Sequence, residues 1–91
     1  MEFEHNPEKS IANRHKHGIS LEKAQELWFG PFVQGPARKM NEERWMIIGK
    51  LEGKLYTCIF TMRDETIRLI SARRSRENEE AAYYAQITEN T

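Results

Sequence analysis

The sequence has a single cysteine, no long apolar run and no net charge. One cysteine, Cys58, excludes a disulfide within the chain and favours the reducing cytoplasm. No apolar run approaches the ~20 residues of a membrane-spanning helix and no signal peptide opens the chain, so we expect no membrane partner. The 14 basic and 14 acidic residues cancel, which argues against a protein that coats nucleic acid over its whole surface. A length of 91 residues predicts one domain, residues 1–91.

The charge is unevenly distributed along the chain. Residues 37–76 carry ten basic and five acidic side chains, whereas residues 77–91 carry four acidic and no basic ones. This pattern indicates a local anion-binding face followed by an acidic segment, although a mixed solvated surface would give the same counts.

Two helices are predicted in the first third of the chain. Residues 6–18 begin with an Asn-Pro pair, which suits the N-cap and the first helical position, and end at a glycine. The second helix starts after the N-cap Ser20 and stops at Gly30. Its apolar residues recur at helical spacing. The short link between the two helices predicts a helical hairpin.

Strand patterns surround this hairpin. Residues 1–5 and 32–38 favour short strands, and three longer segments are rich in β-branched and aromatic residues and joined by tight turns, namely residues 44–51, 55–62 and 67–73. The prediction is an α+β domain of order β-α-α-β-β-β-β-α, with the hairpin packed on one face of an antiparallel meander.

A last helix is predicted after Ser75, which suits its N-cap. The expected apolar face is modest (Ala81, Tyr84, Ala85 and Thr88). One of Tyr83 and Tyr84 is expected to pack while the other projects. Residues 88–91 are expected to fray.

Arginines stand at the ends of the predicted meander strands. Arg44 opens the first strand and Arg63 ends the second, so they should meet at one end, whereas Arg73 ends the third strand and should lie at the other. Strict alternation of side chains also places Ile67, Leu69, Ser71 and Arg73 on a common face of the third meander strand. In the second meander strand, it places Thr57, Ile59, Thr61 and Arg63 on a common face. Guanidinium groups next to hydroxyls suit a phosphate, and salt bridges with nearby carboxylates are the competing interpretation.

Other residues could exchange protons. Lys16 and His17 end the first helix, where His17 could act as an acid or base or only close the helix. Glu42 and Glu43 precede Arg44, so either could serve as a base or form an ordinary salt bridge. His15 and His17 point to different sides of a helix, and no metal-ligand motif, P-loop or nucleophile elbow is present, so neither metal nor cofactor is predicted.

Three stretches of the chain form one recognisable pattern, namely "FEHNPEKSIANRHKHGIS", "GKLEGKLYTCIFTMR" and "IRLISARRS", the last followed by Glu79 and Tyr83. Over residues 2–84 this pattern resembles the BrnT toxins of type II toxin–antitoxin systems. The resemblance implies a fold similar to RelE-type ribonucleases and RNA cleavage that halts translation. It also implies neutralisation by a BrnA-like antitoxin, through which the complex would reach operator DNA and repress its operon.

The resemblance also implies site residues. Its motifs fall on Lys16, His17, Glu43, Arg44, Arg63 and Arg73 as catalytic candidates and on Arg74, Arg76, Glu79 and Tyr83 as substrate-binding ones. Cleavage would proceed by attack of the 2′-hydroxyl on the adjacent phosphate, with Glu43 or His17 as base and His17 or Lys16 as acid.

One departure from the family pattern bears on activity. The stretch after the Ser-Ala-Arg motif is usually strongly basic, but here it reads "SRENEEAAYY". A catalytically degenerate toxin that only binds its antitoxin, or a module that binds single-stranded RNA through its sheet without cleaving it, is therefore an alternative.

Overall fold

The computed structural model describes residues 1–37 and 43–89. The predicted order of elements is observed. In chain order they are β1 (Glu2–Glu4), α1 (Pro7–His17), α2 (Leu21–Ala24), the 3-10 helix η1 (Gln25–Phe29), β2 (Phe32–Ala37), β3 (Arg44–Leu51), β4 (Lys54–Arg63), β5 (Thr66–Arg74) and α3 (Glu77–Glu89). The second predicted helix changes from α to 3-10 geometry after Ala24. α3 includes residues 88 and 89, where a frayed end is expected, and residues 38, 90 and 91 lie outside the described ranges.

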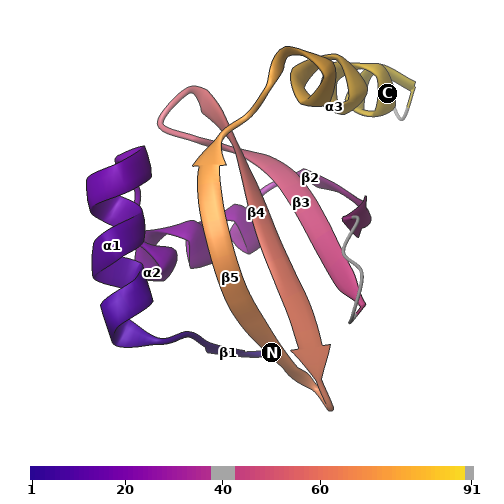
Figure 1. Ribbon diagram of the computed structural model, residues 1–91. Coiled ribbons are helices and arrows are strands. Elements are labelled where there is room, and N and C mark those ends of the chain that lie inside the picture. The colour runs from indigo at the N-terminus through magenta and orange to yellow at the C-terminus, as the bar shows by residue number, and fades with distance from the viewer. Residues whose placement is uncertain (38–42, 90–91) are drawn as a thin grey trace.

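Within the described ranges, five strands form one mixed sheet in the order β1-β5-β4-β3-β2. β3, β4 and β5 pair antiparallel, as the predicted meander requires. β2 extends the sheet antiparallel to β3, and β1 adds to the other edge parallel to β5. α1 and α2 pack on β5, and α3 packs on β2 and β3 (Figure 1). Among the described residues, no helix has both the length and the apolarity needed to cross a membrane.

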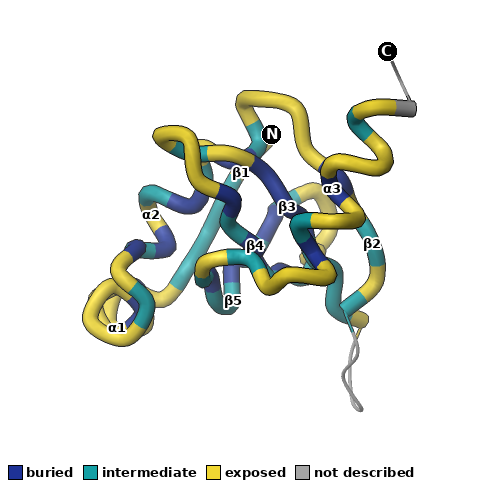
Figure 2. Tube along the Cα trace, turned by 90° about the horizontal axis from the view of Figure 1, so that it is seen from above, coloured by how far each residue is buried: buried dark blue, intermediate teal, exposed yellow. Residues whose placement is uncertain are grey.

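The two sheet faces carry separate apolar clusters. The cluster beneath α1, α2 and η1 is the larger and includes Leu21, Leu27, Ile47, Cys58, Phe60, Ile67, Leu69 and Ala72. The cluster beneath α3 is made of Val33, Ile48, Leu55 and Tyr83. Figure 2 shows the buried residues concentrated on the strands and the side of α1 away from the sheet exposed. α3 contributes Tyr83 to this smaller cluster, and the partly buried Ile87 packs against it.

A β-bulge in β5 overturns one prediction about side-chain faces. Ile59 pairs with Ser71 and Phe60 pairs with Leu69, so Ile70 is an extra residue in β5. Because of this extra residue, Leu69 faces the helical hairpin while Ser71 and the later Arg73 face the other side. The prediction that all four β5 residues share a face is therefore wrong.

The α3 stripe is also shifted from its predicted position. Tyr83 is 5% exposed and packs on the sheet. Tyr84 is 49% exposed, and its ring contacts the ring of Tyr83 edge-on. The first of the two tyrosines therefore packs and the second projects. Ser75 does not cap the helix, because α3 starts at Glu77 and the Ser75 hydroxyl bonds Thr57 at 2.8 Å instead.

Asn13 joins α1 to the sheet through buried hydrogen bonds that the sequence pattern does not reveal. Its Nδ2 donates to the carbonyls of Ile19 and Ala72 at 2.7 and 2.8 Å, and its Oδ1 accepts from the Ala72 amide at 3.2 Å. Side-chain amides that satisfy buried backbone groups on two elements fix the relative position of those elements. Asn13 therefore sets where α1 lies along β5.

Gly18 ends α1 as predicted, and its backbone supports a quantitative test. Its φ of 77° lies in the left-handed region, and its amide donates to the Arg14 carbonyl at 2.8 Å. A Cβ at this position would meet no atom within 4 Å, so Gly18→Ala has only a backbone cost. We expect this variant to lower the free energy of unfolding by about 1 kcal/mol in urea titrations. Gly30→Ala is the control, since Gly30 has a φ of −116° and similar open space. Equal stability of the two variants would contradict the prediction.

Candidate anion-binding site

A small cavity of about 130 Å³ lies at the end of the sheet away from α3. Its lining side chains come from α1, β3, β4 and β5 and are predominantly cationic, namely Lys9, Arg44, Thr61, Arg63, Arg68 and Ile70. No carboxylate is among these lining residues in the part of the chain that the structure describes. The cavity therefore concentrates positive charge in a protein whose net charge is zero.

Strand register explains why these residues meet. Thr61 pairs with Arg68 across β4 and β5, and Arg63 lies at the last position of β4. The Thr61 hydroxyl donates to the Glu43 carbonyl at 2.7 Å, which joins the start of β3 to β4. Arg44 and Arg63 therefore lie at the same end of the β3–β4 hairpin, as predicted. Glu43 is exposed next to this end, and Glu42 lies outside the described residues.

The carboxylate of Glu4, in β1, approaches two of the arginines that line the cavity. A single oxygen, Oε1, lies 3.3 Å from Arg68 and 3.8 Å from Arg63. The Arg63 side chain is 67% exposed and Glu4 is 39% exposed, so water screens both contacts. Ion pairs of this kind are worth about 0–1 kcal/mol, and the arginines remain accessible to a competing anion.

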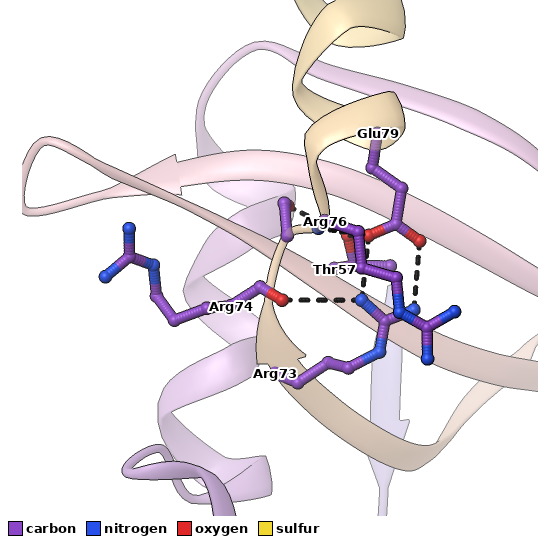
Figure 3. Close-up of polar contacts among 6 residues, drawn as sticks. Thr57, Arg73, Arg74, Arg76 and Glu79 are labelled. Carbon is purple, nitrogen blue, oxygen red and sulfur yellow. Dashed lines mark hydrogen bonds and ion pairs between the residues drawn. The ribbon is translucent and has the colours of Figure 1, made fainter.

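Arg73 is at the opposite end of the sheet and has a different environment. Arg73 pairs with Thr57 of β4 in the strand register. Thr57 lies six residues before Arg63 on the same strand, so the two arginines are separated by roughly 20 Å along the strand direction. The Arg73 guanidinium forms a two-pronged contact with Glu79 on α3, at 2.7 and 2.9 Å (Figure 3). Of the two interpretations of the strand-end arginines, phosphate binding and a salt bridge, the salt bridge is the one observed for Arg73.

Glu79 is the hub of this second group. Its Oε1 accepts hydrogen bonds from the Thr57 hydroxyl at 2.9 Å and from the Arg76 amide at 2.8 Å, in addition to Arg73. Burial alone would raise the pKa of Glu79, but the hydrogen bonds from Arg73, Arg76 and Thr57 outweigh it and lower this pKa to about 2. The hydrogen bond with Glu79 likewise raises the pKa of Arg73. The pair is therefore fully ionised near neutral pH.

The remaining substrate-binding candidates surround this hub or lie beneath α3. The Arg74 guanidinium lies 5.7 Å from the centre of the Tyr56 ring. Arg76 uses its backbone amide on Glu79, and as a residue it is exposed. Tyr83 is buried in the smaller apolar cluster. These residues belong to the Arg73 end of the sheet.

Lys16 and His17 form the last turn of α1. Lys9, which lines the cavity, is seven residues earlier than Lys16, or about 10 Å along the helix axis. The structure therefore does not bring Lys16 and His17 together with Arg44 and Arg63, although a general acid must lie within hydrogen-bond reach of its target.

Sequence reasoning missed Lys9, Arg68 and Glu4. For Arg68 a signal exists, because a charged residue between the apolar Ile67 and Leu69 of a strand must face away from the core. Nothing local identifies Lys9 or Glu4, since their approach depends on the parallel pairing of β1 with β5 and on the packing of α1.

A second hollow, of about 700 Å³, lies along α1 and the start of α2. Its lining carries both charge signs and includes His5, Ile11, Arg14, His15, Ser20 and Glu22. None of the predicted site residues lines it. Among the described residues, no group of three His, Cys, Asp or Glu side chains is arranged to hold a metal ion.

The fold and the cavity together define an α+β domain with a cationic cavity at one end of its sheet. A family model described as "Ribonuclease toxin, BrnT, of type II toxin-antitoxin system" matches residues 5–79, most of the chain. The chain therefore belongs to the BrnT family of ribonuclease toxins. The match ends at Glu79, so Tyr83 and the greater part of α3 lie beyond it. No curated protein matches the sequence.

Proposed function

We propose that this protein is a RelE-like endoribonuclease toxin that cleaves RNA in the cytoplasm without a metal ion and inhibits translation. The observation that carries the proposal is the cavity in which Arg44 and Arg63 meet beside Thr61. Membership of a family of ribonuclease toxins supplies the reaction class. A BrnA-like antitoxin would neutralise the single toxin domain and carry the complex to operator DNA, where the two would repress their operon.

The proposed chemistry starts with attack of the 2′-hydroxyl on the adjacent phosphate. Glu43, exposed beside the cavity, would accept the hydroxyl proton. Arg44 and Arg63 would stabilise the negative charge that develops on the phosphorane, which is usually the largest electrostatic contribution to such a reaction. The bond to the 5′-oxygen then breaks, this oxygen takes up a proton from solvent water, and a 2′,3′-cyclic phosphate remains on the other product.

Arg73 would contribute to this chemistry only if Glu79 released it. Lys16 or His17 would serve as the acid only for a phosphate held near the last turn of α1. Both roles therefore need an arrangement different from the one in which the substrate phosphate occupies the cavity.

The proposal is tested with the purified protein and an end-labelled single-stranded RNA in the presence of EDTA. We expect cleavage, and mass spectrometry of the products should show 2′,3′-cyclic phosphate ends. Cleavage that EDTA abolishes would contradict metal independence. Cleavage only when ribosomes are added would place the substrate on the ribosome.

A degenerate toxin that only binds its antitoxin is the second candidate. The observation in its favour is that Glu79 engages Arg73 in a partly buried ion pair, while α3 carries acidic residues in its first turn (Glu77, Glu79 and Glu80). Absence of cleavage both with and without ribosomes, together with intact binding to the antitoxin, would support this candidate.

A further inference from the structure

The cavity holds more positive charge than the two arginines of the proposed reaction supply. Lys9 and Arg68 line it with Arg44 and Arg63, which gives four formal positive charges among the described lining residues. Glu4 offsets one of these charges through a single oxygen shared by Arg63 and Arg68. Among Lys9, Arg63 and Arg68 alone, three positive charges therefore face the single negative charge of Glu4.

We propose that Lys9, Arg63 and Arg68 form a phosphodiester-binding subsite for RNA, in which the Glu4 carboxylate, beside the cavity, competes with a substrate phosphate for Arg63 and Arg68. This inference rests on the proposed function, because it assigns the substrate contacts of that site. It adds a role in binding RNA for Lys9 and Arg68, and it adds a role for Glu4 as a competitor of the RNA phosphate.

The geometry of the ion pairs supports displacement of Glu4. Its contacts of 3.3 and 3.8 Å are long for charge-assisted hydrogen bonds, which are typically about 2.7–2.9 Å. The Arg73–Glu79 pair has such short contacts, with side chains only 22% and 7% exposed. The contact between Arg73 and Glu79 is therefore closed, whereas the contacts of Glu4 with Arg63 and Arg68 are open and lie beside the cationic cavity.

The size of the cavity indicates which part of the substrate it holds. Its volume of about 130 Å³ is well below the roughly 300–1,000 Å³ of sites that enclose a whole small molecule. A phosphate group with its neighbouring sugar oxygens suits this space, and a complete nucleotide does not. Two guanidinium forks and an ammonium group match the several oxygens of a phosphodiester.

The position of Lys9 adds a second element to the subsite. Lys9 is in the first turn of α1, while Arg63 and Arg68 come from β4 and β5. A phosphate held by all three would connect the helix to the sheet, in addition to the contacts that Asn13 makes further along α1. The nucleotides next to this phosphate in the RNA would then lie over the half-buried side chains of Ile59 and Ile70.

The test measures binding of a short fluorescent 2′-O-methyl RNA by anisotropy, since this RNA lacks the 2′-hydroxyl needed for cleavage. Lys9→Gln and Arg68→Gln should each weaken binding about fivefold at 0.1 M salt and reduce the salt dependence by about one phosphate contact. Glu4→Gln should strengthen binding by about the same factor, a gain that misfolding would not produce. Lys54→Gln and Glu52→Gln make the same charge changes on the β3–β4 turn, at the opposite end of the sheet, and should leave binding unchanged.

The outcomes separate this subsite from the proposed activity. Unchanged binding in Lys9→Gln and Arg68→Gln, unchanged or weaker binding in Glu4→Gln, or no binding by the wild-type protein at low salt would each overturn the subsite, even if ordinary RNA is still cleaved. If the binding changes occur as expected but ordinary RNA is not cleaved, the subsite stands and the proposed ribonuclease activity fails.

Discussion

Arg63→Ala is expected to slow RNA cleavage by roughly 10²–10³-fold while the protein remains folded. Arg63 ends β4 and lines the cavity with a largely exposed guanidinium, which lies 3.8 Å from the Glu4 oxygen. Removing a donor that acts on transition-state charge raises the barrier without removing any buried contact. The measurement is the initial rate with a labelled single-stranded RNA in EDTA, for variants purified in the same way.

Two further variants make the Arg63 result specific. Lys54→Ala removes a positive charge from the exposed β3–β4 turn at the other end of the sheet, and its rate should stay near that of the wild type. Arg63→Lys keeps the charge but loses the planar fork, so its rate should fall between those of the wild type and Arg63→Ala. Equal rates for the wild type and Arg63→Ala would place the reaction elsewhere or indicate a contaminating nuclease.

Local signals predicted the start of α1, the end of α1 and the start of α2 well. The side chain of Asn6 accepts hydrogen bonds from the first-turn amides of α1, and that of Ser20 does the same for α2. Gly18 adopts the left-handed conformation that a helix end requires. Each of these features depends on a few neighbouring residues, so the sequence contains the necessary information.

Predictions that depended on pairing across the sheet were less successful. The extra residue Ile70 reverses the side-chain alternation of β5, and no local pattern marks its position. The predicted split between Arg44 with Arg63 and the distant Arg73 is observed, because it needs only strand direction. The contact of Arg63 with Glu4 depends on where β1 packs, and the contact of Arg73 with Glu79 depends on where α3 packs. Neither contact could be predicted from the sequence.

The family pattern places catalytic candidates at both ends of the molecule, and the structure gives the two ends different properties. One end offers accessible cations around a cavity. The other contains a partly buried ion pair between β5 and α3 (Figure 3), beside the smaller apolar cluster. Arg73 and Glu79 are therefore best tested first through stability.

Glu79→Gln is expected to lower the free energy of unfolding at pH 7 by on the order of 2 kcal/mol. The substitution keeps the shape of the side chain but removes the charge that pairs with Arg73, and its amide cannot accept hydrogen bonds at both ends as the carboxylate does. Urea titrations followed by circular dichroism measure the change. Glu77→Gln is the control, because Glu77 is exposed in the same first turn of α3, and it should cost about 0.5 kcal/mol or less.

The pH dependence identifies the source of this stabilisation. The pKa of Glu79 is lowered to about 2 in the folded protein from an ordinary value of 4.5, so folding favours the ionised carboxylate. Its contribution is complete above about pH 4.5 and is lost as the pH falls towards about 2. The stability difference between the wild type and Glu79→Gln should therefore be constant from pH 7 to pH 5 and shrink below pH 4.5. A difference that stays constant down to pH 2.5 would show that packing, and not the ionised pair with Arg73, holds α3 on the sheet.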